Sequence, residues 1–149
     1  MSATANWFGN SFVGQYSATA ARRIDFVTDT IKCSLHTVTY VPNQDTHTFW
    51  SDTTNEVSGT GYTTGGTTLT SKTVTYDSAS NETRLDAADP AWTTVTFSGA
   101  RIAVFYKDTG TTTTSPLIAW HNFGGDQTVA GANFTIVLDA TGLAKIVAL

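Results

Sequence analysis

The sequence predicts an all-β protein with a single domain, folded as an antiparallel β-sandwich or as a jelly-roll-like relative of one. Three observations favour this class. Threonine, which is stiff at χ1 and suits pleated strands better than helices, supplies 30 of the 149 residues. Apolar and polar residues alternate with period two in many short segments, whereas a sustained helical period is hard to find. Turn-forming residues separate these segments at roughly 8 to 12 residue spacing, as in sandwiches and barrels.

The length of the chain predicts one domain, and the pattern of its first residues predicts an arm before that domain. A domain of this size buries roughly two thirds of the surface that its unfolded chain exposes, so one hydrophobic core is enough to hold it. Residues 1–23 mix aromatic residues with Gly, Ser, Asn and Ala, and show no strong period beyond a candidate strand at 11–17. We therefore expect an extended N-terminal arm at 1–23, packed on a neighbouring subunit, and a β-sandwich domain at 24–149.

The alternating segments give the expected strands in chain order. They lie at residues 30–35, 37–40, 73–76, 82–85, 94–97, 100–106, 116–123, 133–138 and 144–149. Clusters of Gly, Asp, Asn and Ser stand between them and mark turns. Two pairs of neighbouring strands are predicted to form hairpins, 73–76 with 82–85 and 133–138 with 144–149.

Residues 41–66 are predicted to form a long loop insertion, with a short helical stretch near 48–56. Long ordered loops commonly carry function or pack against another surface. The segment PNQDTHTFWSD (42–52) contains two acids, a histidine and two large aromatic residues. We interpret it as a packed loop that Phe49 and Trp50 anchor, and we expect it at an interface with another subunit or another protein.

His47 stands between Asp45 and Asp52 in this segment, and imidazole with carboxylate is a combination that binds metals or transfers protons. Zinc needs three or four ligands, yet no second His or Cys follows at ligand spacing. Calcium loops need oxygen ligands at alternate positions, which this segment does not supply. We therefore assign no metal ligand here and expect the two acids to cap backbone amides.

Motifs for other chemistry are incomplete. The glycine-rich GTGYTTGG (59–66) lacks the Lys of a phosphate loop and precedes a β pattern, not a helix. No Gly-x-Ser-x-Gly elbow is present, and the sequence alone cannot place two of its Asp residues at the separation of a glycosidase pair. We assign no catalytic residue and no cofactor, and an enzyme is the third hypothesis. Trp92 and Trp120 raise carbohydrate binding as a further alternative to a place in the core.

Charge and apolar patterning argue against two classes of partner. The net charge is −4, and Lys and Arg are scattered in ones and twos, so no basic patch for nucleic acid is expected. No run approaches the ~18 apolar residues of a membrane span, and the N-terminus lacks the blocks of a signal peptide. We expect a soluble protein, made in a reducing cytoplasm. The single cysteine, Cys33, is expected to be a small buried hydrophobe.

Several phrases of the chain, in this order, resemble a family of small structural proteins from tailed bacteriophages. The phrases are SATAARRID (17–25), TDTIK (28–32), YVPNQDTH (40–47), NEVSGTGYTTGG (55–66), VFYKDTG (104–110) and SPLI (115–118). Members of that family are described as virion, head-decoration, head-fibre or minor tail proteins. The resemblance covers nearly the full chain, and it implies a virion component without a catalytic motif.

The leading hypothesis is therefore a non-enzymatic capsid decoration (cement) protein on the capsid surface of the virion, made in the bacterial host cytoplasm. Its expected partners are the major capsid protein and itself, as a homotrimer at local threefold positions. Aromatic residues dominate interface hot spots, so the candidate contact residues are Trp7, Phe8, Phe12, Tyr16, Phe49 and Trp50. The alternative is a tail, neck or head-fibre component with affinity for host glycans.

Overall fold

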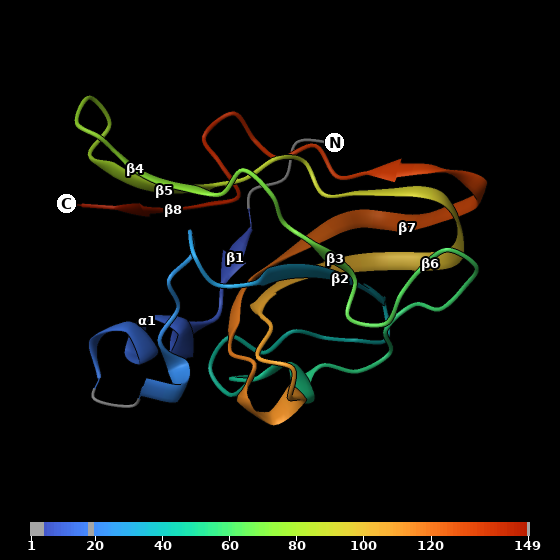
Figure 1. Ribbon diagram of the computed structural model, residues 1–149, viewed down its shortest axis with the longest axis horizontal. Coiled ribbons are helices and arrows are strands. Elements are labelled where there is room, and N and C mark those ends of the chain that lie inside the picture. Colours follow the sequence, from blue (N-terminus) through green and yellow to red (C-terminus); the bar gives the residue numbers. More distant parts are fainter. Residues whose placement is uncertain (1–4, 18–19, 149) are drawn as a thin grey trace.

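Two antiparallel sheets pack together in the computed structural model, which describes residues 5–17 and 20–148 (Figure 1). The larger sheet contains, in spatial order, β1 (Asn6–Trp7), β7 (Leu117–Thr135), β6 (Ala91–Lys107), β2 (Ile31–Thr37) and β3 (Thr67–Thr68). The smaller sheet contains β4 (Thr73–Asp77), β5 (Glu82–Asp86) and β8 (Ala144–Val147). The described residues also form one α-helix, α1 (Gly9–Tyr16), and the 3-10 turns Ala20–Arg22, Trp50–Asp52 and Thr112–Thr114. The predicted all-β sandwich is confirmed.

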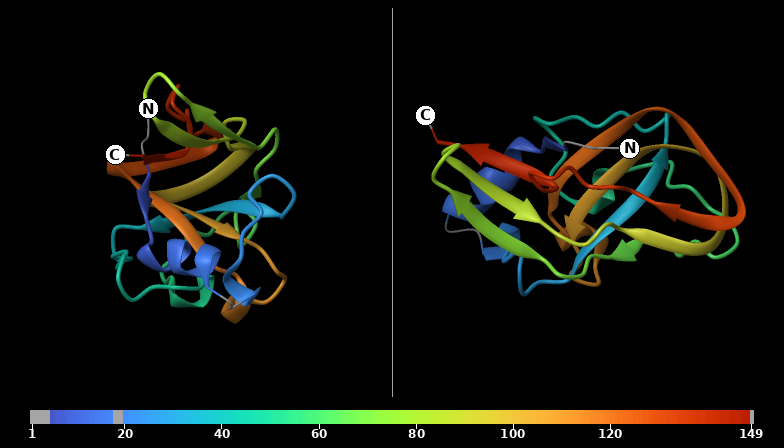
Figure 2. Two further views of the ribbon diagram at one scale, coloured as in Figure 1. Left: turned by 90° about the vertical axis from the view of Figure 1, so that its left-hand side faces the viewer. Right: turned by 90° about the horizontal axis from the view of Figure 1, so that it is seen from above.

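The hairpin of β6 and β7 contributes to both layers of the sandwich. Its strands are 17 and 19 residues long, and their outer halves curl back over the larger sheet (Figures 1 and 2). The pairing register shifts on both sides of Ala100, where Gly99 and Gly124 have φ of 73° and 77°. Glycine in this left-handed conformation allows a bulge that bends a strand without ending it. The sequence predicts turns at these glycines, and so it divides each long strand into two.

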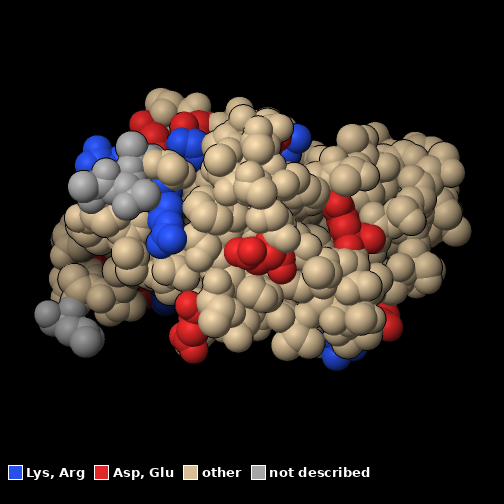
Figure 3. Space-filling view, turned by 90° about the horizontal axis from the view of Figure 1, so that it is seen from below, with Lys and Arg blue, Asp and Glu red and all other residues tan. Residues whose placement is uncertain are grey.

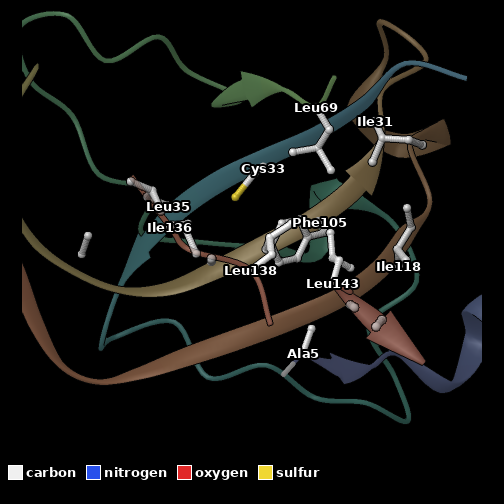
Figure 4. Close-up of a cluster of buried hydrophobic side chains, with 14 of the residues drawn as sticks. Ala5, Ile31, Cys33, Leu35, Leu69, Phe105, Ile118, Ile136, Leu138 and Leu143 are labelled. Carbon is white, nitrogen blue, oxygen red and sulfur yellow. The ribbon is translucent and has the colours of Figure 1, made fainter. Parts of the chain in front are cut away.

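The main core fills the space between the two layers. Alternate residues of β2 point into it, and they meet residues of β6 and of the segment that links β7 to β8 (Figure 4). The largest of these side chains that are fully buried are Ile31, Leu35, Phe105, Ile136 and Leu143. Cys33 lies among them with no exposed surface, as predicted, and burial raises the pKa of its thiol.

A second, smaller core lies on the opposite face of the larger sheet. Residues 102 to 106 of β6 are all buried, and they point alternately into the main core and into this second core. The second core is completed from outside the sheet by Phe8, Tyr40 and Trp50. The part of the loop 41–66 around Trp50 therefore helps to cover the second face of a sheet that is apolar on both faces, whereas Val57 and Tyr62 of the same loop pack against the main core.

Three local predictions are wrong. Of the expected strand 37–40, Thr37 is the last residue of β2, and the chain turns at residues 38–39 directly after it. Strand β8 does not pair with 133–138, because it pairs with β5, where Thr83 lies opposite Ile146. The candidate strand at 11–17 is instead the helix α1. An isolated helix of 8 residues is marginal in water, so α1 depends on tertiary packing that a local pattern does not reveal.

The described part of the predicted arm folds back on its own chain. Asn6 and Trp7 pair with β7, and Phe8 fills the second core with no exposed surface. Packing of residues 1–23 on a neighbouring subunit stays a prediction, and residues 1–4 and 18–19 of that segment lie outside the described residues. Among the described residues, no helix is long and apolar enough to cross a membrane.

Gly66 gives a direct test of the contact between the long loop and β2. Its φ is +77°, and a Cβ at this position would stand 1.8 Å from the backbone oxygen of Cys33. Gly124 has the same φ, but no atom of the described residues lies within 4 Å of the corresponding Cβ. We expect Gly124→Ala to lower the free energy of unfolding by about 1 kcal/mol through the backbone alone, and Gly66→Ala to lower it by roughly 3 kcal/mol or more. Urea unfolding followed by circular dichroism measures both, and equal losses would contradict the close approach.

Candidate functional site

An apolar groove opens where the smaller sheet overhangs α1, at the left of Figure 1. Its volume is about 490 Å³. The wall on one side comes from α1 and the segment 24–27, and the wall on the other side comes from β4, β5 and β8. The apolar residues of its lining are Trp7, Phe12, Tyr16, Ile24, Phe26, Val27, Val74, Leu85, Ile118 and Ile146. The polar residues of its lining are Ser11, Gln15, Asp25 and Thr83.

Strand register explains why the wall from the smaller sheet is apolar. Val74 lies opposite Leu85, and Thr83 lies opposite Ile146, so these cross-strand neighbours share one face of the sheet. This face continues the lining of the main core, but α1 covers only part of it. Val74 and Ile146 accordingly remain 46% and 38% exposed. Apolar surface of this kind, gathered in one place, is typical of a contact site.

Three of the predicted contact residues meet at this groove. The rings of Trp7 and Phe12 lie 4.8 Å apart, and the Trp7 indole donates a hydrogen bond to the Lys145 backbone oxygen at 3.0 Å. Tyr16 projects from the end of α1 and is 88% exposed. Phe8, in contrast, has no exposed surface to offer to a partner in this fold.

Charge contributes little to the groove. Asp25 is the charged residue of its lining, and hydrogen bonds from the side chain and the backbone N–H of Thr28 lower the pKa of its carboxyl group. Over the face of the molecule drawn in Figure 3, acidic and basic side chains lie in small separate groups, and most of the surface is uncharged. The groove therefore suits apolar side chains of another molecule better than a charged ligand.

The segment 42–52 is an ordered loop whose polar side chains cap its own backbone. The Asp52 carboxylate accepts hydrogen bonds from the N–H groups of Thr48 and Phe49 at 2.8 and 2.9 Å, as predicted. Asn43, and not Asp45, provides the second cap. His47 bonds the Tyr40 hydroxyl at 3.1 Å. Among the described residues, no group of three or more His, Cys, Asp and Glu side chains is placed to hold a metal ion.

The remaining contact candidates, Phe49 and Trp50, lie on the cover of the second core. Phe49 receives the guanidinium of Arg22 over its ring, 5.7 Å from the centroid. Trp50 stacks on Tyr106 with a centroid distance of 5.3 Å, and its indole N–H donates to the Ser34 hydroxyl at 3.2 Å. Both side chains therefore attach the loop to its own chain, and a role in contact with a partner stays a prediction.

Ser34 and His36 form a pair that outwardly resembles a nucleophile and its base. Ser34 Oγ lies 2.9 Å from His36 Nε2, and His36 Nδ1 lies 2.8 Å from the Thr54 backbone oxygen. A carbonyl oxygen only accepts, so Nδ1 carries the proton and Nε2 accepts from Ser34. Neither side chain has exposed surface, which leaves a substrate no access to the Ser34 hydroxyl. The pair is an anchor between β2 and the loop.

Two hollows of about 270 and 220 Å³ flank Trp50, and both share Thr112 with it. We call them together the Trp50 cleft, which is defined by Lys32, His36, Trp50, Ser51, Thr53, Thr54, Asn55, Glu56, Thr64, Gly65, Tyr106, Asp108, Gly110, Thr111, Thr112 and Ser115. The sequence indicates only Trp50 as special. Its neighbours come from four separate segments that strand pairing brings together, so no local motif predicts them.

Trp92 and Trp120, for which the sequence suggested carbohydrate binding as an alternative, lie outside the Trp50 cleft. Trp92 is 6% exposed within the main core, and Trp120 packs against the second core. Their indole N–H groups are buried and have no hydrogen-bond partner among the residues that the structure describes. Trp50 is the tryptophan that the structure surrounds with hydroxyl, amide and carboxylate groups.

The buried His36 predicts a specific dependence of stability on pH. Burial lowers the pKa of its imidazole from 6.5 to about 4. Below pH 6.5 the unfolded chain binds a proton here that the folded chain does not, so the stabilisation is present above that pH and is lost toward pH 4. We expect His36 to account for roughly 3 kcal/mol of the fall in unfolding free energy across this window.

Urea unfolding at several pH values measures this contribution as a slope. His36→Gln should flatten the slope between pH 6.5 and about 4, whatever it does to the stability at neutral pH. His36→Asn, which also removes the imidazole, should flatten the slope to the same extent. An unchanged slope in the His36 variant would show that another group controls this window.

The groove and the Trp50 cleft thus present two different chemistries, one apolar and one polar. Comparison with protein-family models, with curated proteins and with solved structures gives no match to this chain.

Proposed function

We propose that this protein is a non-enzymatic structural component of a tailed-phage virion, and that it acts as a capsid decoration (cement) protein. The observation that carries the proposal is the groove, in which Trp7, Phe12 and Tyr16 meet beside exposed valines at the open end of the sandwich. Few charges surround it. Interfaces of this composition rely on apolar area and shape more than on ion pairs. The resemblance to phage structural proteins gives the setting.

The groove would receive an apolar segment of the major capsid protein. A protein that binds the assembled head lattice, and not the separated capsid subunits, stabilises the assembly by mass action, so no bond needs to be made or broken. Each copy would tie neighbouring capsomers together on the outer surface of the head. We expect a homotrimer, because closed symmetry at local threefold positions favours one.

The copy number in the particle separates this function from the alternative of a tail, neck or head-fibre component. On symmetry grounds a decoration protein is present in roughly hundreds of copies per virion, and a neck or tail part in about a dozen or fewer. Gel densitometry of purified virions, with the major capsid protein as internal standard, measures the ratio. We expect the high value, and a dozen copies or fewer would contradict a decoration role.

The groove itself can be tested with two valines of similar exposure. Val27 lines the groove and is 47% exposed, whereas Val38 lies outside its lining and is 56% exposed. Val27→Asp should weaken attachment to heads that lack this protein by about tenfold or more, because it would bury a charge in the contact between the groove and the capsid. Val38→Asp should leave attachment unchanged. Co-sedimentation with purified heads measures both, and equal binding by the two variants would remove the groove from the contact.

A further inference from the structure

The Trp50 cleft has the features of a site for a small polar ligand. Trp50 is half-buried, fixed in orientation by its stacking on Tyr106 and by its hydrogen bond to Ser34. Its indole therefore lies in the wall of two polar hollows as a rigid apolar surface. A fixed aromatic ring with polar groups converging around it is the usual composition of a small-molecule pocket.

Several polar groups of the cleft have hydrogen-bonding capacity to spare. Glu56 Oε1 accepts from the Tyr62 hydroxyl at 2.8 Å and from the Gly65 N–H at 2.7 Å, which fixes the carboxylate. Its other oxygen, Oε2, accepts no hydrogen bond from the described residues, and the hydroxyls of Thr64 and Thr112 make none with them. A ligand with several hydroxyl groups would satisfy these donors and acceptors together.

The charge of the cleft selects against anionic ligands. Lys32 is the cationic side chain in its lining, and it is paired with Asp108 at 2.7 Å. Glu56 adds a further carboxyl group, so the lining offers no unpaired positive charge for a phosphate. The many hydroxyl and amide groups make it equally unsuitable for a lipid chain. What remains is a neutral, hydroxyl-rich molecule with one apolar face.

We propose that the Trp50 cleft binds a neutral saccharide. One pyranose ring would stack on the accessible part of the Trp50 indole, and its hydroxyls would bond to Thr112, which both hollows share, to Glu56 in one hollow and to Thr64 in the other. The cleft lies on the cover of the second core, whereas the groove lines the main core on the other face of the larger sheet. Saccharide binding is thus independent of capsid attachment, and neither depends on the other being correct.

Titration of the full-length, ¹⁵N-labelled chain with glucose, galactose and N-acetylglucosamine tests the proposal. We expect saturable shifts of the Trp50 indole N–H and of the Thr64 and Thr112 amides, with a dissociation constant on the order of millimolar for at least one sugar. Trp50→Ala should abolish the sugar-dependent shifts of the Thr64 and Thr112 amides. Trp7→Phe, in the groove, should leave them unchanged.

Thr112 provides a second variant in case Trp50→Ala fails to fold. Thr112→Val keeps the shape of an exposed side chain but removes its hydroxyl, and it should weaken binding about threefold or more. Thr113→Val, at an exposed neighbour outside the lining, should have no effect. The proposal is overturned if no sugar gives saturable shifts in the cleft at about 100 mM, if the shifts map to the groove, or if the two threonine variants bind equally.

Discussion

The burial of one short segment of β6 on both of its faces is the constraint on which the structure depends. Residues 102 to 106 are apolar without interruption and are all buried, so the larger sheet needs a cover on each side. The smaller sheet, with the curled halves of β6 and β7, covers one face. Phe8, Tyr40 and the loop that carries Trp50 cover the other. The groove and the Trp50 cleft both lie at the margins of these covers.

The loop 41–66 has little regular secondary structure, so its backbone N–H and C=O groups and its position on the sheet depend on contacts other than a continuous strand ladder. Here side chains connect it to β2. Tyr62 donates to Glu56 and accepts from the Leu35 N–H at 2.8 Å, while His36 bonds the Thr54 oxygen. Gly66 passes so close to Cys33 that no side chain fits between them. These contacts fix the long loop against the sheet, and a fixed loop can present a defined binding surface.

The sequence could predict what is local in this fold. Alternation found the hairpin of β4 and β5, and the aromatic residues near the N-terminus led to Trp7, Phe12 and Tyr16 at the groove. The sequence could not predict the features that depend on contacts between segments far apart in the chain. The helix α1 exists because its neighbours pack on it, and β8 pairs with a strand far from it in the sequence, since Ile146 of β8 lies opposite Thr83 of β5. The Trp50 cleft likewise combines β2, β6 and two loops, which only the register of the strands brings together.

The two surfaces differ in how far function can be separated from stability. Val27 and Thr112 are exposed at the rims, so substitutions there change a surface and leave the cores intact. Trp7 and Trp50 contribute both to a binding surface and to the stability of the fold. Each presents an aromatic face to a hollow, while its indole N–H donates a hydrogen bond to the Lys145 backbone oxygen (Trp7) or to the Ser34 hydroxyl (Trp50). Removing either ring would remove that hydrogen bond and leave a core less well packed. Aromatic residues at such margins therefore give rigid binding surfaces because the fold itself already fixes them.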